Sequence, residues 1–170
     1  MLKPPINFKN WIESNRHLLK PPVGNQVVYD QGDFMIMVVG GPNSRKDYHV
    51  DPVEEFFFQL EGDMLLKVIE NGQRADIPIK EGEIFLLPKN LPHSPQRFKD
   101  TVGLVIEYKR EKGALDSFQW YCDECNSLLH EVSLQLKDIV AQLPPLFKSY
   151  WEDIDSRTCA RCGAVQEPPD

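Results

Sequence analysis

The residues that say most about the fold are Gly41-Pro-Asn-Ser-Arg-Lys-Asp-Tyr-His49-Val-Asp-Pro-Val-Glu-Glu55-Phe-Phe-Phe-Gln-Leu-Glu-Gly62. His49 and Glu55 are six positions apart, an even offset that puts both side chains on one face of an extended strand or hairpin arm. A second stretch, Gly82-Glu-Ile-Phe-Leu-Leu-Pro88-Lys-Asn-Leu-Pro92-His93, combines a glycine turn, an apolar strand and a proline-bracketed turn. That turn delivers His93, so the two stretches predict three ligands inside a β-barrel.

These three side chains match a known metal-binding set. Two neutral imidazoles and one carboxylate form the facial triad, which holds Fe(II) on one side of an octahedron and leaves the other side open. His49, Glu55 and His93 therefore predict an iron-dependent oxygenase whose open positions accept substrate and dioxygen.

Three other residues compete for these roles. Glu54 is as acidic as its neighbour, but strand alternation places it on the opposite face. His17 and His130 lack companion ligands, and an isolated histidine is more often structural than metal-binding. We expect both histidines to be structural.

Two arginines flank the predicted ligands. Arg45 precedes His49 by four residues, and Arg97 follows His93 by four. Even offsets along extended segments direct both guanidinium groups toward the metal, where they could clamp a carboxylate through paired hydrogen bonds. We expect a carboxylated substrate; the alternative is that both are surface arginines beside strand ends.

One further carboxylate interrupts an apolar strand. Glu107, within residues 102–108, would be buried there, and a buried carboxylate needs a partner or has a raised pKa. It either pairs with an arginine or takes a proton from bound substrate, and we favour the second role. Asp47 and Asp51 share the strand parity of His49, so either could support the ligands by hydrogen bonding.

Composition restricts the function classes. The 170 residues and 41% apolar content suffice for one ordinary domain with a modest extension. The net charge of −7 leaves no basic stripe, so no nucleic-acid partner is expected. Neither a signal peptide nor a membrane-spanning stretch is recognisable, which predicts a soluble, cytoplasmic protein without a membrane partner.

The four cysteines form two Cys-x-x-Cys pairs, at Cys122 and Cys125 and at Cys159 and Cys162. In a reducing compartment such pairs are more often thiolate metal ligands than disulfides. Four thiolates in a tetrahedral array suit structural Zn or a rubredoxin-type Fe site, and they leave no position for substrate. We expect this second Fe or Zn to be structural.

Short strands dominate the first two thirds of the chain. An amphipathic helix is expected over residues 5–20, capped by Asn7 or Asn10 and stopped by Pro21-Pro22. Strands punctuated by glycine turns, with no helices between them, predict a closed or sandwiched antiparallel barrel of the jelly-roll kind. The runs are 27–29, 34–39, 55–60, 64–69, 75–79, 83–87 and 102–108.

The pattern changes after residue 110. Apolar residues between 128 and 143 predict a mostly helical segment ended by Pro144-Pro145, with the cysteines on either side of it. We therefore divide the chain into a catalytic domain over residues 1–112, which includes the amino-terminal helix, and a metal-binding extension over residues 113–170.

The two opening stretches resemble the metal-binding motifs of the cupin superfamily, whose fold is a double-stranded β-helix or jelly-roll barrel. This chain departs from the usual motifs at three positions. Asp51 stands where a second histidine is common, Asn90 replaces a turn glycine, and Arg97 replaces a terminal asparagine. Three protein ligands remain, which leaves room on the metal for two substrate atoms and O2.

A narrower resemblance covers nearly the whole chain. Residues 47–62, 85–98, 101–107 and 120–122 are similar to the 3-hydroxyanthranilate 3,4-dioxygenase family. The segment His93-Ser-Pro-Gln-Arg97 is more diagnostic than the general cupin motifs, and the paired cysteines are similar to those of compact bacterial and fungal members.

The resemblance implies a reaction, residue roles and an assembly state. The reaction is the ring opening of 3-hydroxyanthranilate by O2 to 2-amino-3-carboxymuconate semialdehyde, in quinolinate and NAD biosynthesis or in tryptophan catabolism. The resemblance also suggests a homodimer. It implies Fe(II) on His49, Glu55 and His93, the substrate carboxylate on Arg45 and Arg97, ring substituents on Glu107, and a pocket position for Asn25.

Two other functions remain open. Another cupin enzyme, such as a thiol dioxygenase, a different ring-cleaving dioxygenase or a metal-dependent isomerase, would share the fold but not the substrate. A non-catalytic cupin sensor would bind aromatic acids without consuming oxygen.

Overall fold

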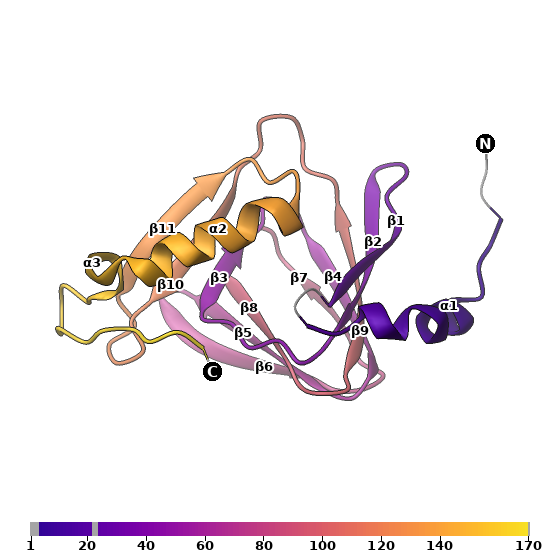
Figure 1. The fold of residues 1–170 in the computed structure, drawn as a ribbon, viewed down its shortest axis with the longest axis horizontal. Coiled ribbons are helices and arrows are strands. Elements are labelled where there is room, and N and C mark those ends of the chain that lie inside the picture. Colours follow the sequence, from indigo (N-terminus) through magenta and orange to yellow (C-terminus); the bar gives the residue numbers. More distant parts are fainter. Residues whose placement is uncertain (1–3, 22–23, 170) are drawn as a thin grey trace.

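Two antiparallel sheets face each other in the computed structural model, which describes residues 4–21 and 24–169 (Figure 1). The five-stranded sheet has the order β1 (Asn25–Tyr29), β2 (Phe34–Gly40), β9 (Val102–Tyr108), β4 (Glu55–Glu61) and β7 (Ile84–Leu87). The six-stranded sheet has the order β11 (Leu128–Leu134), β10 (Asp116–Tyr121), β3 (Asp47–Val50), β8 (His93–Arg97), β5 (Met64–Glu70) and β6 (Gln73–Ile79). The predicted all-β core is confirmed.

Alternation along the strands builds the core between the sheets. In β4 every second side chain from Glu55 to Gln59 is buried, and Phe57 between them lies in the main apolar cluster. In β5 the residues Met64 and Leu66 enter the same cluster from the other sheet. Apolar side chains fill one part of the barrel, while Glu55 carries a charge into another part that holds the polar site.

The amino-terminal helix is shorter than predicted. α1 (Phe8–Asn15) is followed by the single 3-10 turn η1 (Arg16–Leu18). The Asn7 side chain accepts from the Asn10 backbone N–H, so Asn7 is the cap. Ile12 is buried in a second apolar cluster on the five-stranded sheet. The predicted stop at Pro22 lies outside the described residues.

The prediction for residues 128–143 is wrong. Residues 128–134 form strand β11, and α2 (Ile139–Glu152) begins later and runs through Pro144 and Pro145. β11 pairs with β10 along its length, and this pairing overrides a sequence pattern that fits helix and strand alike. The helix continues past the prolines because Phe147 and Tyr150 pack on β10, which offsets the cost of two missing N–H groups.

The carboxyl-terminal segment continues the six-stranded sheet. β10 pairs with β3, with Phe118 opposite His49 and Trp120 opposite Asp47. Directly paired side chains share a face of the sheet, so α2, which packs on Phe118 and Trp120, covers the face that carries His49 (Figure 1). The sheet is therefore unbroken across residue 113, and the division into two domains stays a prediction.

Candidate active site

The three predicted metal ligands converge. His49 on β3 pairs directly with His93 on β8, and Glu55 reaches them from β4 of the facing sheet. The Glu55 Oε1 atom lies 2.8 Å from His93 Nε2 and 3.9 Å from His49 Nδ1. All three residues therefore offer ligand atoms within 4.8 Å of one another.

The surroundings of these atoms fit a metal ion. Glu55 Oε1 is buried and faces His93 Nε2, a second potential ligand atom, at 2.8 Å, an arrangement that a cation shared by the two atoms would satisfy. The Nδ1 atom of His93 lies 2.9 Å from the Leu91 carbonyl, so it carries the proton and leaves Nε2 with a free lone pair. Burial raises the pKa of Glu55, but a positive charge on the adjacent His93 and its hydrogen bond lower this pKa to about 2, and a metal cation in that place would act in the same direction. The carboxylate is thus ionised, as a metal ligand must be.

The turn before His93 explains one departure from the cupin motif. Asn90 has a φ of 63°, the left-handed region that glycine adopts most easily and asparagine tolerates. Its backbone N–H donates to the Asp51 carbonyl at 2.7 Å, which joins this turn to the end of the strand that carries His49.

Arg97 is buried, and only about 20% of the Arg45 side chain is exposed, so the alternative of solvated surface arginines is wrong. Arg45 forms an ion pair with Asp47, which raises its pKa although burial alone would lower it. Arg97 is only 4% exposed, and within the described part of the chain its side chain hydrogen-bonds only to the neutral Gln59, at 3.4 Å. Burial lowers the pKa of Arg97 to about 10, and Glu55 only partly opposes this shift.

Glu107 both pairs with an arginine and has a raised pKa, the two alternatives that the sequence left open. It forms an ion pair with Arg110, and burial, assisted by the charge of Glu55, still raises its pKa to about 7. Its carboxylate lies within 4.8 Å of the carboxylates of Glu55 and Asp51. Glu107 therefore borders the predicted metal ligand Glu55 with an acidity suited to proton transfer near neutral pH.

Arg110 and Asp116 join the site although sequence reasoning missed both. The Arg110 guanidinium bonds to Asp51, Glu107 and Asp116. Asp116 Oδ1 lies 2.8 Å from His49 Nε2, so Arg110 is linked to a metal ligand through this carboxylate. Neither residue stands at a motif position; the polar side chain of Asp116 at the start of an apolar strand was the only available signal.

Asn25 lies at the start of β1, beside the apolar core. Its Nδ2 atom is 3.5 Å from the sulfur of Met37, which is a weak acceptor, and its buried Oδ1 has no partner among the described residues. The amide is therefore available to a ligand, which agrees with the pocket position that the family resemblance implies.

The amino-acid sequence matches a known protein family over most of its length. A model of the 3-hydroxyanthranilic acid dioxygenase family matches residues 1–151. The chain belongs to this family. A 3-hydroxyanthranilate 3,4-dioxygenase of Jannaschia sp. is 55% identical over 169 residues, which are 97% of this chain and 94% of that protein. An enzyme of the same name from Xanthomonas euvesicatoria is 52% identical and spans 100% of this chain and 96% of its own length.

Solved structures support the fold of this 3-hydroxyanthranilic acid dioxygenase family member. A protein from Neisseria meningitidis has a TM-score of 0.51 and 20% identity, covering 62% of this chain and all of its own (100%). A cupin-2 domain protein from Shewanella frigidimarina has a TM-score of 0.50 and 19% identity, over 61% of this chain and 94% of its own. At these identities the likeness shows the cupin fold alone.

The four cysteines of this family member also converge. Cys122 Sγ lies 3.6 Å from Cys162 Sγ, and Cys125 Sγ lies 3.5 Å from Cys159 Sγ. Tetrahedral ligands at a metal–sulfur distance of about 2.3 Å are about 3.8 Å apart, so these separations fit one shared ion. Hydrogen bonds involving Ser127 lower the pKa of Cys125 to about 6, which favours the thiolate.

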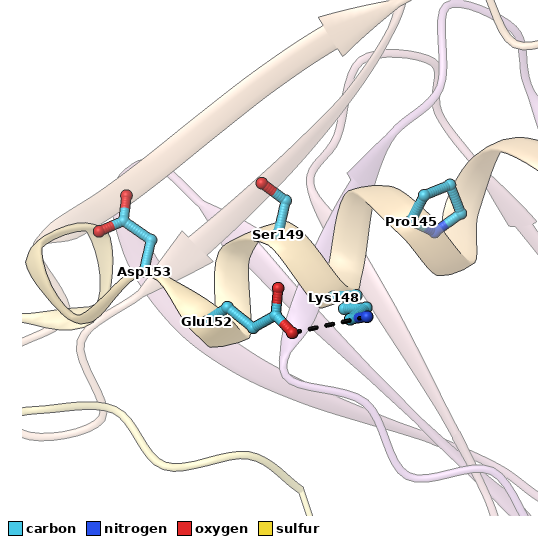
Figure 2. A pocket seen from close by; sticks show the side chains of 5 residues that line it. All are labelled: Pro145, Lys148, Ser149, Glu152 and Asp153. Carbon is cyan, nitrogen blue, oxygen red and sulfur yellow. Dashed lines mark ion pairs between the residues drawn. The ribbon is translucent and has the colours of Figure 1, made fainter.

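A shallow hollow of about 390 Å³ lies elsewhere, on the exposed side of α2 (Figure 2). It is lined by Pro145, Lys148, Ser149, Glu152 and Asp153, and Lys148 pairs with Glu152 at 3.6 Å. Both charged side chains are largely exposed, so we assign no chemistry to this surface. None of the described helices is long and apolar enough to span a membrane.

Proposed function

We propose that this chain opens the ring of 3-hydroxyanthranilate with O2 to give 2-amino-3-carboxymuconate semialdehyde, with Fe(II) held by His49, Glu55 and His93. The observation that supports this most directly is the buried Glu55 oxygen, which lies 2.8 Å from His93 Nε2 and 3.9 Å from His49 Nδ1, so that three potential ligand atoms converge. When bound, Fe(II) would supply coordination positions for the ring and O2 and a path for electrons from the ring to O2.

Arg45 and Arg97 would bind the substrate carboxylate. Arg97 supports this role most strongly because its buried charge has no carboxylate partner among residues 4–21 and 24–169. A substrate carboxylate would supply that partner and fix the ring in one orientation. Arg45, already paired with Asp47, would add a second contact or steer the substrate during entry.

Glu107 would accept a proton from a ring substituent. Its raised pKa makes the carboxylate basic enough to accept a proton from an acidified hydroxyl or amino group near neutral pH. Arg110 would keep the carboxylate oriented and would stabilise its ionised form before the transfer. Asn25 would line the pocket beside the substrate.

The remaining proposals concern the whole protein. The four-cysteine site would hold structural Fe or Zn, and the reduced thiolates it needs suit a cytoplasmic protein. The active assembly would be a homodimer. The product would feed quinolinate formation, either for NAD synthesis or in tryptophan breakdown.

The test is anaerobic loading with Fe(II), followed by exposure to 3-hydroxyanthranilate and O2. We expect oxygen uptake equal to substrate loss, and a new absorbance from the ring-opened product. His93→Ala should abolish both, because it removes a ligand that is only 2% exposed. Substrate binding without oxygen uptake would favour a cupin sensor, and uptake with only a different substrate would favour another cupin oxygenase.

A further inference from the structure

Arg97 is held in a recess between the two sheets. It lies on β8, opposite Met64 of β5, and its guanidinium reaches across to Gln59 on β4 and Gly103 on β9. Gln59 and Gly103 are directly paired across β4 and β9, so they form one spot on the inner face of the five-stranded sheet. On the side of the five-stranded sheet, the recess is lined by the Gln59 amide and by Gly103, which has no side chain.

The missing side chain makes the space for the guanidinium. A Cβ atom on Gly103 would lie 2.5 Å from Arg97 Nη1 and 2.9 Å from Gln59 Oε1, distances that real Cβ contacts do not reach. Gly103 does not have a positive φ, so the backbone itself would accept other residues. Glycine is needed at this position because of the Arg97 side chain.

The amide makes the recess neutral. Gln59 is 1% exposed, and its Nε2 donates to the Glu61 carbonyl at 3.2 Å, which turns Oε1 toward Arg97. A neutral acceptor leaves the guanidinium charge uncompensated, whereas a carboxylate would neutralise it. Arg45 shows the contrast, because its charge is already paired with Asp47.

We propose that Gln59 and Gly103 are positioning residues that keep Arg97 as a buried, unpaired cation for an incoming carboxylate. The pair thereby sets the preference of the site for a ring that carries a carboxylate over the same ring without one. This inference rests on the proposed function, because it assumes that Arg97 binds the substrate carboxylate.

The first test changes the charge of the recess and keeps its shape. Gln59→Glu places an anion beside Arg97, which would then pair internally. We expect the KM for 3-hydroxyanthranilate to rise by about ten- to a hundredfold, the loss of one charge-assisted contact, while kcat and iron content change little. Gln59→Met, similar in volume but neutral, should raise KM by less than about fivefold. An equal effect of both variants would overturn the charge argument.

The second test changes the position of the guanidinium. Gly103→Ala forces the flexible end of Arg97 aside without a backbone penalty. The dissociation constant of 3-hydroxyanthranilate, measured without O2 on the Fe(II)-loaded protein, should rise by about tenfold or more. That of 2-aminophenol, which lacks the carboxylate, should change less than about twofold. Equal weakening of both ligands, or of neither, would overturn the proposal.

Gln73→Glu provides the matched control, because Gln73 is exposed on β6 and the same substitution there adds charge at the surface. Its KM should equal that of the unmodified chain. Failure of the proposed function would be recognised separately, as absence of oxygen uptake with 3-hydroxyanthranilate in the unmodified chain. An active unmodified chain with unchanged KM in Gln59→Glu and Gly103→Ala would refute only the inference drawn from the recess.

Discussion

Three largely buried arginines of this barrel differ in their partners, and this difference distinguishes an arginine that is suited to bind substrate from arginines that pair with the protein's own carboxylates. Arg110 is surrounded by three carboxylates, and Arg45 has one. Arg97 has only an amide. A buried charge without a counter-charge destabilises the protein, so an anion that binds beside Arg97 would relieve this cost. Arg110, in contrast, stabilises carboxylates that the protein already contains.

Arg97→Ala should raise the KM for 3-hydroxyanthranilate by about thirtyfold or more, the cost of losing one buried charge pair. Iron content should stay unchanged, because the guanidinium makes no hydrogen bond to His49, Glu55 or His93. Steady-state kinetics and metal analysis of the same preparation provide the measurement. Arg16→Ala, which removes a partly exposed arginine of η1, is the control. Loss of iron with an unchanged KM would show that Arg97 supports the metal site.

Arg110→Met should lower the free energy of unfolding by about 3–5 kcal/mol, because removal of one member of a buried ion network leaves the others unpaired. Urea denaturation measures this change. Adding Asp51→Asn to the variant should recover part of the loss, since one of the unpaired charges is then absent. Strictly additive effects would mean that the two side chains do not interact.

The convergence of His49, Glu55 and His93 was predictable from sequence, but the residues that surround them were not. The even spacing of His49 and Glu55 predicted that the two side chains meet, but they meet from β3 and β4 of facing sheets and not on one face of a single strand. Arg110 and Asp116 reach the site through ion pairs and hydrogen bonds between residues as many as 67 positions apart. Spacing along the chain contains no information about such contacts.

At the scale of elements, strands with glycine turns on both sides were predicted well, and segments that depend on tertiary pairing were not. β5 and β6 are joined by a short turn and pair with each other, so neighbouring residues in the sequence are enough to predict them. β8 contains Pro95 and four polar residues, and its place between β3 and β5 makes it a strand. β11 and α2 depend in the same way on β10, whose Phe118 and Trp120 they cover.

The attachment of α1 and η1 to the barrel gives a pH-dependent prediction. Both terminal nitrogens of the Arg16 guanidinium donate to Glu61 on β4 at 2.8 Å, and this pairing lowers the pKa of Glu61. A lowered carboxylate pKa contributes stability above its unfolded value of about 4.3, and the contribution is lost as pH falls through the folded value. About 40% of each side chain is exposed, so solvent screening keeps the contribution small.

Glu61→Gln should therefore lower the free energy of unfolding by about 0.5–1 kcal/mol at pH 7. The difference from the unmodified chain should shrink steadily as pH falls below about 4. Urea midpoints measured from pH 7 downward test this expectation. A difference that is the same at every pH would show that Glu61 acts through packing and not through its charge.

At the scale of the whole molecule, the four-cysteine site and the barrel share one sheet. Cys122 follows directly on β10, and Arg74 of β6 donates to the Tyr121 and Cys122 carbonyls at 3.1 and 2.9 Å. Gln166, four residues after Cys162, accepts a hydrogen bond from the Tyr150 hydroxyl at 2.7 Å. The ring of Tyr150 stacks on that of Trp120 of β10, with 4.2 Å between the ring centroids. The cysteine loops therefore connect α2 and the end of β10 to the sheet that carries His49 and His93.

The two cysteine loops have the same geometry, which supports a single ion between them. The backbone N–H of Asn126 donates to the Cys122 carbonyl at 3.0 Å, and that of Gly163 donates to the Cys159 carbonyl at 2.8 Å. Both donors lie four residues after a cysteine and have positive φ, 61° and 77°. Each loop thus presents two sulfurs from a tight turn, the arrangement of a saturated, structural site.

Cys122→Ser should accordingly damage folding more than chemistry. Loss of one thiolate from a saturated site removes binding energy that is also folding energy, and we expect the unfolding midpoint to fall by about 10 °C or more. Cys159→Ser, in the other loop, should give the same result, while Ser127→Ala keeps all four sulfurs and should retain the metal. Calorimetry and metal analysis measure these effects.

The decisive comparison is turnover per catalytic iron in the folded fraction of each cysteine variant. The four-cysteine site is connected to the proposed catalytic residues indirectly, through β10, α2 and β6, so this turnover should stay within about threefold of the unmodified chain, a change of less than about 1 kcal/mol in the barrier. A Cys122→Ser protein that remained stable and iron-loaded but inactive would give the cysteine site a direct part in the reaction. Such a result would contradict the purely structural role proposed for the four-cysteine site.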